Sequence, residues 1–149
     1  MESITEKFAK FIVDAEYDGI SEKAKTKAKL CILDCFGALL AGSMEPINKP
    51  VKRFIERVGG KEEATVIGLG LKTSAPQAAF ANGVFGHVLD YDDTNQIFVG
   101  HASVVTLPTM LALGEAMTLC GEDVITAYMV GTEVQWKLGD PPSDVGKPL

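Results

Sequence analysis

Apolar residues recur at helical spacing through almost the whole chain, and this pattern constrains the fold more than any other feature. Side chains that repeat every three or four residues mark helices that bury one face. Only residues 64–68 are β-branched and apolar in the manner of a strand. We therefore expect a mainly α protein, a helical bundle with one short β-strand or hairpin. The predicted helices cover residues 4–16, 21–40, 46–58, 75–89, 103–119 and 122–138.

The second half of the helix predicted over residues 21–40 is apolar on nearly every side. A helix that is apolar all round is buried all round. We expect neighbouring helices to surround it, and the small residues Gly37 and Ala38 would let another helix come close. Gly42 is expected to end the helix.

The single predicted strand cannot form a sheet alone. Its partner is expected either near residues 69–72, as a hairpin, or in another chain or a missing part. Several apolar helix faces lack an obvious cover within the sequence. We expect residues 1–139 to form one incomplete helical domain and residues 140–149 to form an irregular tail.

The charge of the chain is unevenly placed. The formal net charge is −6. Residues 64–149 hold 9 acidic and 3 basic side chains, and no lysine or arginine lies between Lys72 and Lys137. This balance argues against nucleic acid or an anionic membrane surface as a partner. An anionic ligand bound by this part of the chain would need positive charge from elsewhere.

The sequence also contains information on the cellular compartment. The charged N-terminal segment lacks the apolar core of a signal peptide, and no apolar stretch is long enough to span a bilayer. Three cysteines are too few for a disulfide scaffold. We expect a cytoplasmic protein.

The densest group of chemically able side chains lies at residues 87–101. Both histidines of the chain, His87 and His101, flank three closely spaced aspartates, Asp90, Asp92 and Asp93. A histidine exchanges a proton near neutral pH, so the group is suited to acid–base work. The same run also suits turns and helix caps, and His87 inside a helix is more often structural. The spacing fits no strong metal-ligand signature, so no metal is expected.

Several stretches of the chain resemble the MmgE/PrpD family, the 2-methylcitrate dehydratase-like proteins. The likeness is strongest in the block HVLDYDDT and extends to about residue 139. The segments that carry the likeness are LDCFG (33–37), AG (41–42), ATVIG (64–68), AAFANG (78–83), HVLDYDDT (87–94), LP (107–108), ALGE (112–115) and GTEV (131–134), together with His101 and Ser103.

The resemblance implies a mostly α-helical first domain, a smaller α/β lid domain and homodimers formed through helical faces. It implies lyase chemistry on small di- or tricarboxylic acids, as in 2-methylcitrate dehydratase or cis-aconitate decarboxylase, or epimerisation of a related acid. It implies no nicotinamide or flavin cofactor. By position, His101 matches the catalytic histidine, and Asp90 and Thr94 match residues of the active-site loop. Asp92, Asp93 and His87 are expected to lie in a supporting layer.

The chain departs from the family pattern in ways that affect function. Ala102 stands where the family usually has proline, and the interval from Thr94 to His101 differs in length. Family enzymes are roughly three times longer, and a lysine and a second histidine come from the absent part. We expect an incomplete enzyme with little turnover alone. The alternatives are a non-catalytic helical module that self-associates, an isomerase of the same family and, more remotely, a metal-dependent hydrolase.

Overall fold

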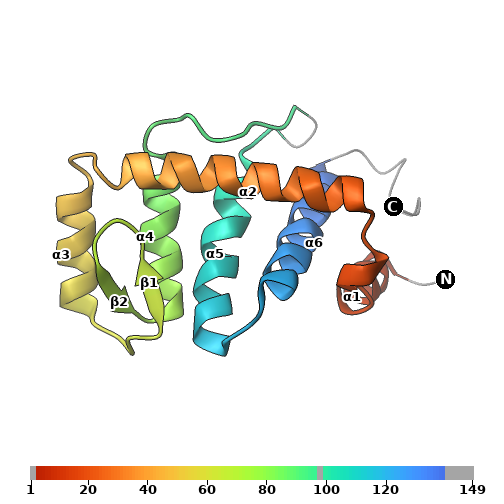
Figure 1. The fold of residues 1–149 in the computed structure, drawn as a ribbon, viewed down its shortest axis with the longest axis horizontal. Helices are drawn as coiled ribbons and strands as arrows, with labels where there is room; N and C mark the ends of the chain where they lie inside the picture. Colours follow the sequence, from red (N-terminus) through yellow and green to blue (C-terminus); the bar gives the residue numbers. More distant parts are fainter. Residues whose placement is uncertain (1–2, 97–98, 140–149) are drawn as a thin grey trace.

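A computed structural model describes residues 3–96 and 99–139, and it confirms the mainly α prediction (Figure 1). A short 3₁₀ helix, Tyr17–Gly19, follows the first helix and was not predicted. The predicted tail at residues 140–149 lies outside the described residues. The helices are α1 (Ile4–Val13), α2 (Glu22–Gly42), α3 (Asn48–Val58), α4 (Ala75–His87), α5 (Ala102–Met117) and α6 (Gly121–Gly139), and the strands are β1 (Ala64–Val66) and β2 (Leu71–Thr73).

Helix α2 is the element on which the other helices meet. The side chain of Ser21 accepts a hydrogen bond from the backbone N–H of Ala24 and so caps its N-terminus. Figure 1 shows α2 running across the ends of α4, α5 and α6. A Cβ on Gly42 would lie 1.9 Å from the backbone oxygen of Phe85. The closest approach is therefore at Gly42, and the expectation for Gly37 was wrong, since a Cβ there would meet nothing within 4 Å.

The prediction that the second half of α2 is buried on every side was also wrong. Cys35 and Leu39 are fully buried, but Leu33 is 68% exposed. Leu30 and Leu40 are exposed as well. The described helices pack against one side of α2 only, so its opposite side keeps an apolar surface.

The two strands form an antiparallel hairpin, which places the expected partner of β1 within this chain. The register pairs Ala64 with Thr73 and Val66 with Leu71. The strand ends at Val66, earlier than predicted, because the turn begins at Ile67 and includes Gly68 in the left-handed region at φ +81°. The buried side chain of Asn82 fixes the hairpin to α4. It accepts from Ile67 N at 2.9 Å and donates to Thr65 O at 3.0 Å.

Two apolar cores lie along α2. The first is built around Leu39 and Phe85 and joins α2, α3, the hairpin and α4. The second is smaller, is built around Leu107 and Tyr128, and joins α2, α5 and α6. The candidate site lies in the loop that joins the end of α4 to the start of α5. Among residues 3–96 and 99–139, no helix combines the length and apolar character that a bilayer-spanning helix requires.

Candidate active site

The loop between α4 and α5 carries the candidate site. Helix α4 ends at His87, and Asp90 follows in the left-handed region at φ +49°. This conformation is uncommon outside glycine, but aspartate tolerates it better than most residues. The backbone N–H of Asn95 donates to Gly100 O at 2.9 Å and closes the far end of the loop. His101 then lies at the N-cap of α5. The loop therefore returns the chain to a point close to where it left.

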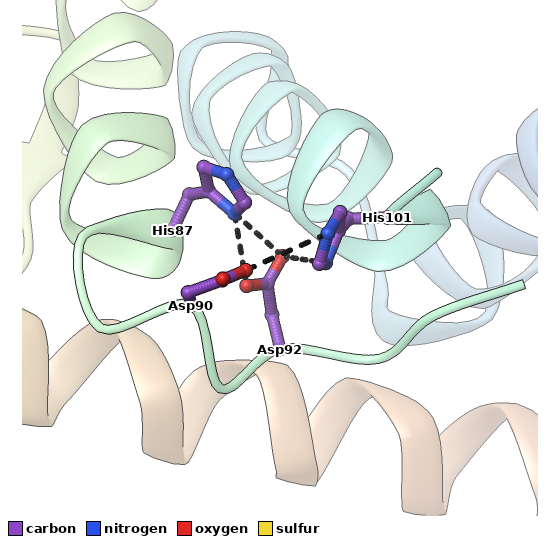
Figure 2. Close-up of side chains that lie close together, drawn as sticks. All are labelled: His87, Asp90, Asp92 and His101. Atoms are coloured by element: carbon purple, nitrogen blue, oxygen red, sulfur yellow. Dashed lines mark hydrogen bonds and ion pairs between the residues drawn. The ribbon is translucent and has the colours of Figure 1, made fainter. Parts of the chain in front are cut away.

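Four of the six predicted site residues meet here. Figure 2 shows His87, Asp90, Asp92 and His101 converging between the end of α4 and the start of α5. Nδ1 of His87 lies 3.0 Å from Oδ1 of Asp92, and Nδ1 of His101 lies 3.2 Å from Oδ2 of Asp92. Nε2 of His101 lies 3.7 Å from Oδ1 of Asp90. We call these four residues the histidine–aspartate cluster.

Asp92 is the centre of the histidine–aspartate cluster. Its side chain is 0% exposed, whereas those of His87 and Asp90 are 52% and 80% exposed. A buried carboxylate is costly unless positive charge or hydrogen-bond donors face it. Within the described residues, the ion-pairing groups that face Asp92 are the two imidazoles. The arrangement places a buried carboxylate between two rings that solvent reaches, where a positive charge is electrostatically favourable.

The two imidazole rings also touch each other. Their centroids are 4.6 Å apart and their planes are inclined by 68°. Each ring therefore contacts both the Asp92 carboxylate and the other ring. His87 is at the end of α4 rather than in its interior, so it is not a buried core histidine.

Asp93 faces away from the histidines and has a different task. Its carboxylate accepts from the backbone N–H of Ser103 at 3.1 Å and from the Ser103 hydroxyl at 2.8 Å. The Ser103 hydroxyl also lies 2.5 Å from the hydroxyl of Tyr128 on α6. An anion is favourable at a helix N-terminus, where the backbone donors lack partners. We call Asp93, Ser103 and Tyr128 the Asp93 cap; it fixes the start of α5 and therefore the position of His101.

Ser103 and Tyr128 of the Asp93 cap were not singled out as site residues from the sequence. Both are buried, and burial raises the pKa of the Tyr128 hydroxyl, although the hydrogen bond with Ser103 lowers it in part. The sequence signal for Ser103 was its place at a helix start. No spacing linked Tyr128 to it, because the two residues belong to different helices.

Thr94 is not part of the histidine–aspartate cluster. It is exposed and lines a cavity of about 360 Å³ between the loop, α2 and α6, and none of the four cluster residues lines that cavity. Lys27 and Trp136 line the same cavity. Lys27 was not predicted as a site residue, although the lysine-rich first half of α2 was visible in the sequence. It supplies a positive charge beside Thr94 that the interval between Lys72 and Lys137 lacks.

Comparison with known proteins decides which family has this arrangement. The family model described as the MmgE/PrpD N-terminal domain matches residues 6–144. The chain belongs to the MmgE/PrpD family. The resemblance read from the motifs is therefore confirmed, and the motif HVLDYDDT provides three residues of the histidine–aspartate cluster.

Two curated relatives are similar to almost all of this chain. Human cis-aconitate decarboxylase is 32% identical over 143 residues, which are 93% of this chain and 30% of that protein. Mouse cis-aconitate decarboxylase is 31% identical over 143 residues, which are 93% of this chain and 29% of that protein. The chain thus spans less than a third of the length of these relatives.

Proposed function

We propose that this chain provides the acid–base groups of a lyase site that acts on a small di- or tricarboxylic acid, such as cis-aconitate or 2-methylcitrate. The observation that carries the proposal is the buried carboxylate of Asp92 between the imidazoles of His87 and His101. The names of the two relatives and the family's chemistry support the choice of substrate class.

His101 is the proposed proton donor and acceptor. In a decarboxylation, the carbon–carbon bond to one carboxylate breaks, carbon dioxide leaves, and the electron pair stays on carbon until an imidazolium gives it a proton. In a dehydration, an imidazole takes a proton from the carbon beside a carboxylate, and the imidazolium so formed gives a proton to the departing hydroxyl group, which leaves as water. Both reactions need a group that holds a proton near neutral pH and returns to its starting state through solvent.

The neighbours of His101 have supporting tasks in this proposal. Asp92 orients the ring and offsets the charge that forms when the ring is protonated, since its carboxylate lies 3.2 Å from Nδ1. Asp90 is 80% exposed and 3.7 Å from Nε2, so it stands at the side from which a substrate would enter. A carboxylic acid substrate is itself negative, and these aspartates repel it. We place its carboxylates instead towards the neighbouring cavity, which Thr94 and Lys27 line together with Asp93 and Glu133.

We assign the further positive charge that a tricarboxylate substrate needs to another polypeptide segment. Lys137 is paired with Glu133 at 3.3 Å and is not free for a substrate. A tricarboxylate facing one free lysine would bind weakly, because unpaired charge is costly to desolvate. We therefore expect weak binding and little turnover from this chain by itself.

Substrate binding can be tested through the two histidines. The chain contains 2 histidines, so its proton NMR spectrum holds two imidazole C2–H signals, which His87→Ala and His101→Ala assign. We expect cis-aconitate to displace both signals saturably and 2-methylcitrate to act similarly. Sodium chloride at matched ionic strength is the control. Signals that move no further with cis-aconitate than with sodium chloride contradict the proposal.

Turnover can be tested with a chimera. The chain replaces the matching 143-residue segment of human cis-aconitate decarboxylase, and the release of carbon dioxide from cis-aconitate is measured. We expect the chimera to release carbon dioxide and His101→Ala to abolish it. A folded chimera that binds cis-aconitate but releases nothing contradicts the lyase assignment. Conversion to an isomer would favour the epimerase alternative.

A second candidate function, self-association without catalysis, is favoured by the outer side of α2. Leu30, Leu33 and Leu40 are spaced by three and seven residues and are 57%, 68% and 43% exposed. Such a stripe is typical of a helix–helix contact. Light scattering tests it: we expect an assembly that Leu33→Asp dissociates, whereas Val13→Asp, at another exposed apolar position, leaves the mass unchanged. An unchanged mass in Leu33→Asp contradicts this candidate.

A further inference from the structure

The histidine–aspartate cluster has the composition of a metal site as well as that of an acid–base group. Two imidazoles and two carboxylates each present one ligand atom, and these four atoms all lie within 4.8 Å of one another. Imidazole and carboxylate are the nitrogen and oxygen ligands that zinc and similar divalent ions take in proteins. The sequence did not predict this, because the spacing matches no ligand signature and the loop alone brings His101 to His87.

The distances within the cluster are close to those that a tetrahedral ion requires. Ligands about 2.0 Å from such an ion are about 3.3 Å from one another. Oδ2 of Asp92 lies 3.3 Å from Nδ1 of His87 and 3.2 Å from Nδ1 of His101. One ligand atom of Asp90 lies within 4.8 Å of the ligand atoms of the other three residues, and its side chain is 80% exposed.

A second observation points to a ligand at the same place. Nδ1 of His101 is a buried nitrogen that makes no hydrogen bond within the described residues, although Asp92 lies 3.2 Å away. A buried polar atom in this state usually has a partner. An ion between Nδ1 and the Asp92 carboxylate would satisfy both atoms and would offset the charge of the buried carboxylate.

We propose that His87, Asp92 and His101 bind a divalent transition-metal ion of the zinc type, with Asp90 as the fourth ligand. A cation at Nδ1 of His101 opposes protonation of the same ring at Nε2, so it inhibits the chemistry assigned above; this second statement rests on the proposed function. Magnesium and calcium prefer sites made of oxygen alone, so the two imidazoles select against them.

The first test is a calorimetric titration of the whole chain with zinc chloride, followed by the two imidazole NMR signals. We expect one ion per chain and displacement of both signals, with no response to magnesium chloride. His87→Ala, at an exposed position, and Asp92→Asn should each weaken binding at least tenfold. Asp93→Asn is the matched control, since Asp93 bonds Ser103 instead of a ring and asparagine keeps one oxygen that accepts from Ser103 and so holds the start of α5; it should change the dissociation constant by less than twofold.

Zinc bound through sulfur must be distinguished from this site. Cys31 and Cys120 are free and reachable, so the titration is repeated with both replaced by serine. Binding that survives this replacement and fails in His87→Ala supports the proposal. Binding that disappears with the cysteines, or imidazole signals that stay in place at saturating zinc, overturns it.

The inhibitory role is tested separately with cis-aconitate. Zinc should compete with cis-aconitate for the two imidazole signals and should suppress carbon dioxide release by the chimera, and a chelator should restore both. Release that requires zinc would overturn the inhibitory role. Zinc binding in a chain whose imidazoles ignore cis-aconitate would contradict the proposed function while leaving the metal site intact, so the two failures are distinguishable.

Discussion

Asp92 and Asp93 are adjacent in the sequence, yet they belong to two regions with different physical tasks. The carboxylate of Asp92 faces two imidazoles, His87 and His101, that are both partly exposed to solvent. The carboxylate of Asp93 faces a backbone N–H and a hydroxyl, which keep their protons at neutral pH. The comparison shows that the path of the loop, rather than residue type, decides whether a carboxylate faces two imidazoles or holds a helix start in place.

The two regions meet at the N-terminus of α5. His101 is the N-cap residue of α5, and the Asp93 cap binds the same turn two residues later. The position of the histidine therefore depends on the aspartate that does not touch it. The following predictions separate the two tasks, beginning with the largest expected effect.

His101→Ala in the chimera should lower the rate of carbon dioxide release by about 10³-fold, the scale expected when a general acid is removed. The circular dichroism spectrum should stay close to that of the parent, because His101 makes no side-chain cap for α5, whereas the unfolding midpoint should fall because buried Asp92 loses one of its two imidazole partners. A rate that falls less than tenfold would mean that His101 is not the proton donor.

Asp93→Ala should destabilise the chain by about 2–3 kcal/mol, because the charge-assisted bonds to Ser103 are lost while the buried hydroxyl stays in place. Urea unfolding measures this effect. Ser103→Ala keeps the bond from the backbone N–H and should cost less, about 1 kcal/mol. Equal losses in the two variants would contradict the role given to the Asp93 cap.

Thr94→Val should weaken the apparent binding of cis-aconitate by less than about tenfold and leave the maximal rate of the chimera nearly unchanged, because it removes one hydrogen bond to a substrate carboxylate. Lys27→Gln should act in the same direction through lost charge. Steady-state kinetics separates the two parameters. A fall in the maximal rate with unchanged binding would place Thr94 among the groups that take part in chemistry.

The pKa of the Cys35 thiol depends on the charges of both aspartates, and Cys35 has the smallest expected effect on stability near neutral pH. Burial, followed by the charges of Asp93 and Asp92, raises the pKa of its thiol from 9.0 to about 12. Because the folded chain holds this proton more tightly than the unfolded chain, the stabilising contribution is complete below about pH 9 and decreases as pH rises towards 12. Urea midpoints between pH 8 and 10.5 should fall from about pH 9 onward.

A matched variant isolates the contribution of Cys35. Cys35→Ala should delay the alkaline loss until about pH 10, where the raised pKa of Tyr128 begins to act in the same direction. An unchanged onset in Cys35→Ala would show that the thiol is not the group responsible.

Much of the fold was predictable because local patterns decide it. Helical periodicity and the cap at Ser21 predicted the helices, and the β-branched run at residues 64–68 predicted one strand, with a hairpin as one of its possible pairings. The wrong predictions concern which faces of a helix are covered by neighbouring helices. An apolar sequence such as residues 30–42 does not say which side finds a neighbour, and Leu33 stayed exposed although the sequence indicated burial.

The candidate site was predictable only in part. The run from His87 to Thr94 identified the residues, and the resemblance selected His101. The sequence could not separate Asp92 from Asp93, because their difference arises from the direction in which a loop turns after Asp90. It also missed Lys27, which reaches the cavity beside Thr94 from a helix far away in sequence.

The most direct test of the account compares Asp92→Asn with Asp93→Asn in the chimera, measuring carbon dioxide release and the urea midpoint on the same preparations. The account predicts that Asp92→Asn lowers the maximal rate by about 10²-fold at a similar midpoint, as when a partner that orients a catalytic imidazole is removed. Asp93→Asn should lower the midpoint and keep the rate of the folded enzyme within about fivefold, since it touches no ring. The opposite pattern, with Asp93 controlling the rate and Asp92 only the stability, would contradict the assignment of the chemistry to the histidine–aspartate cluster.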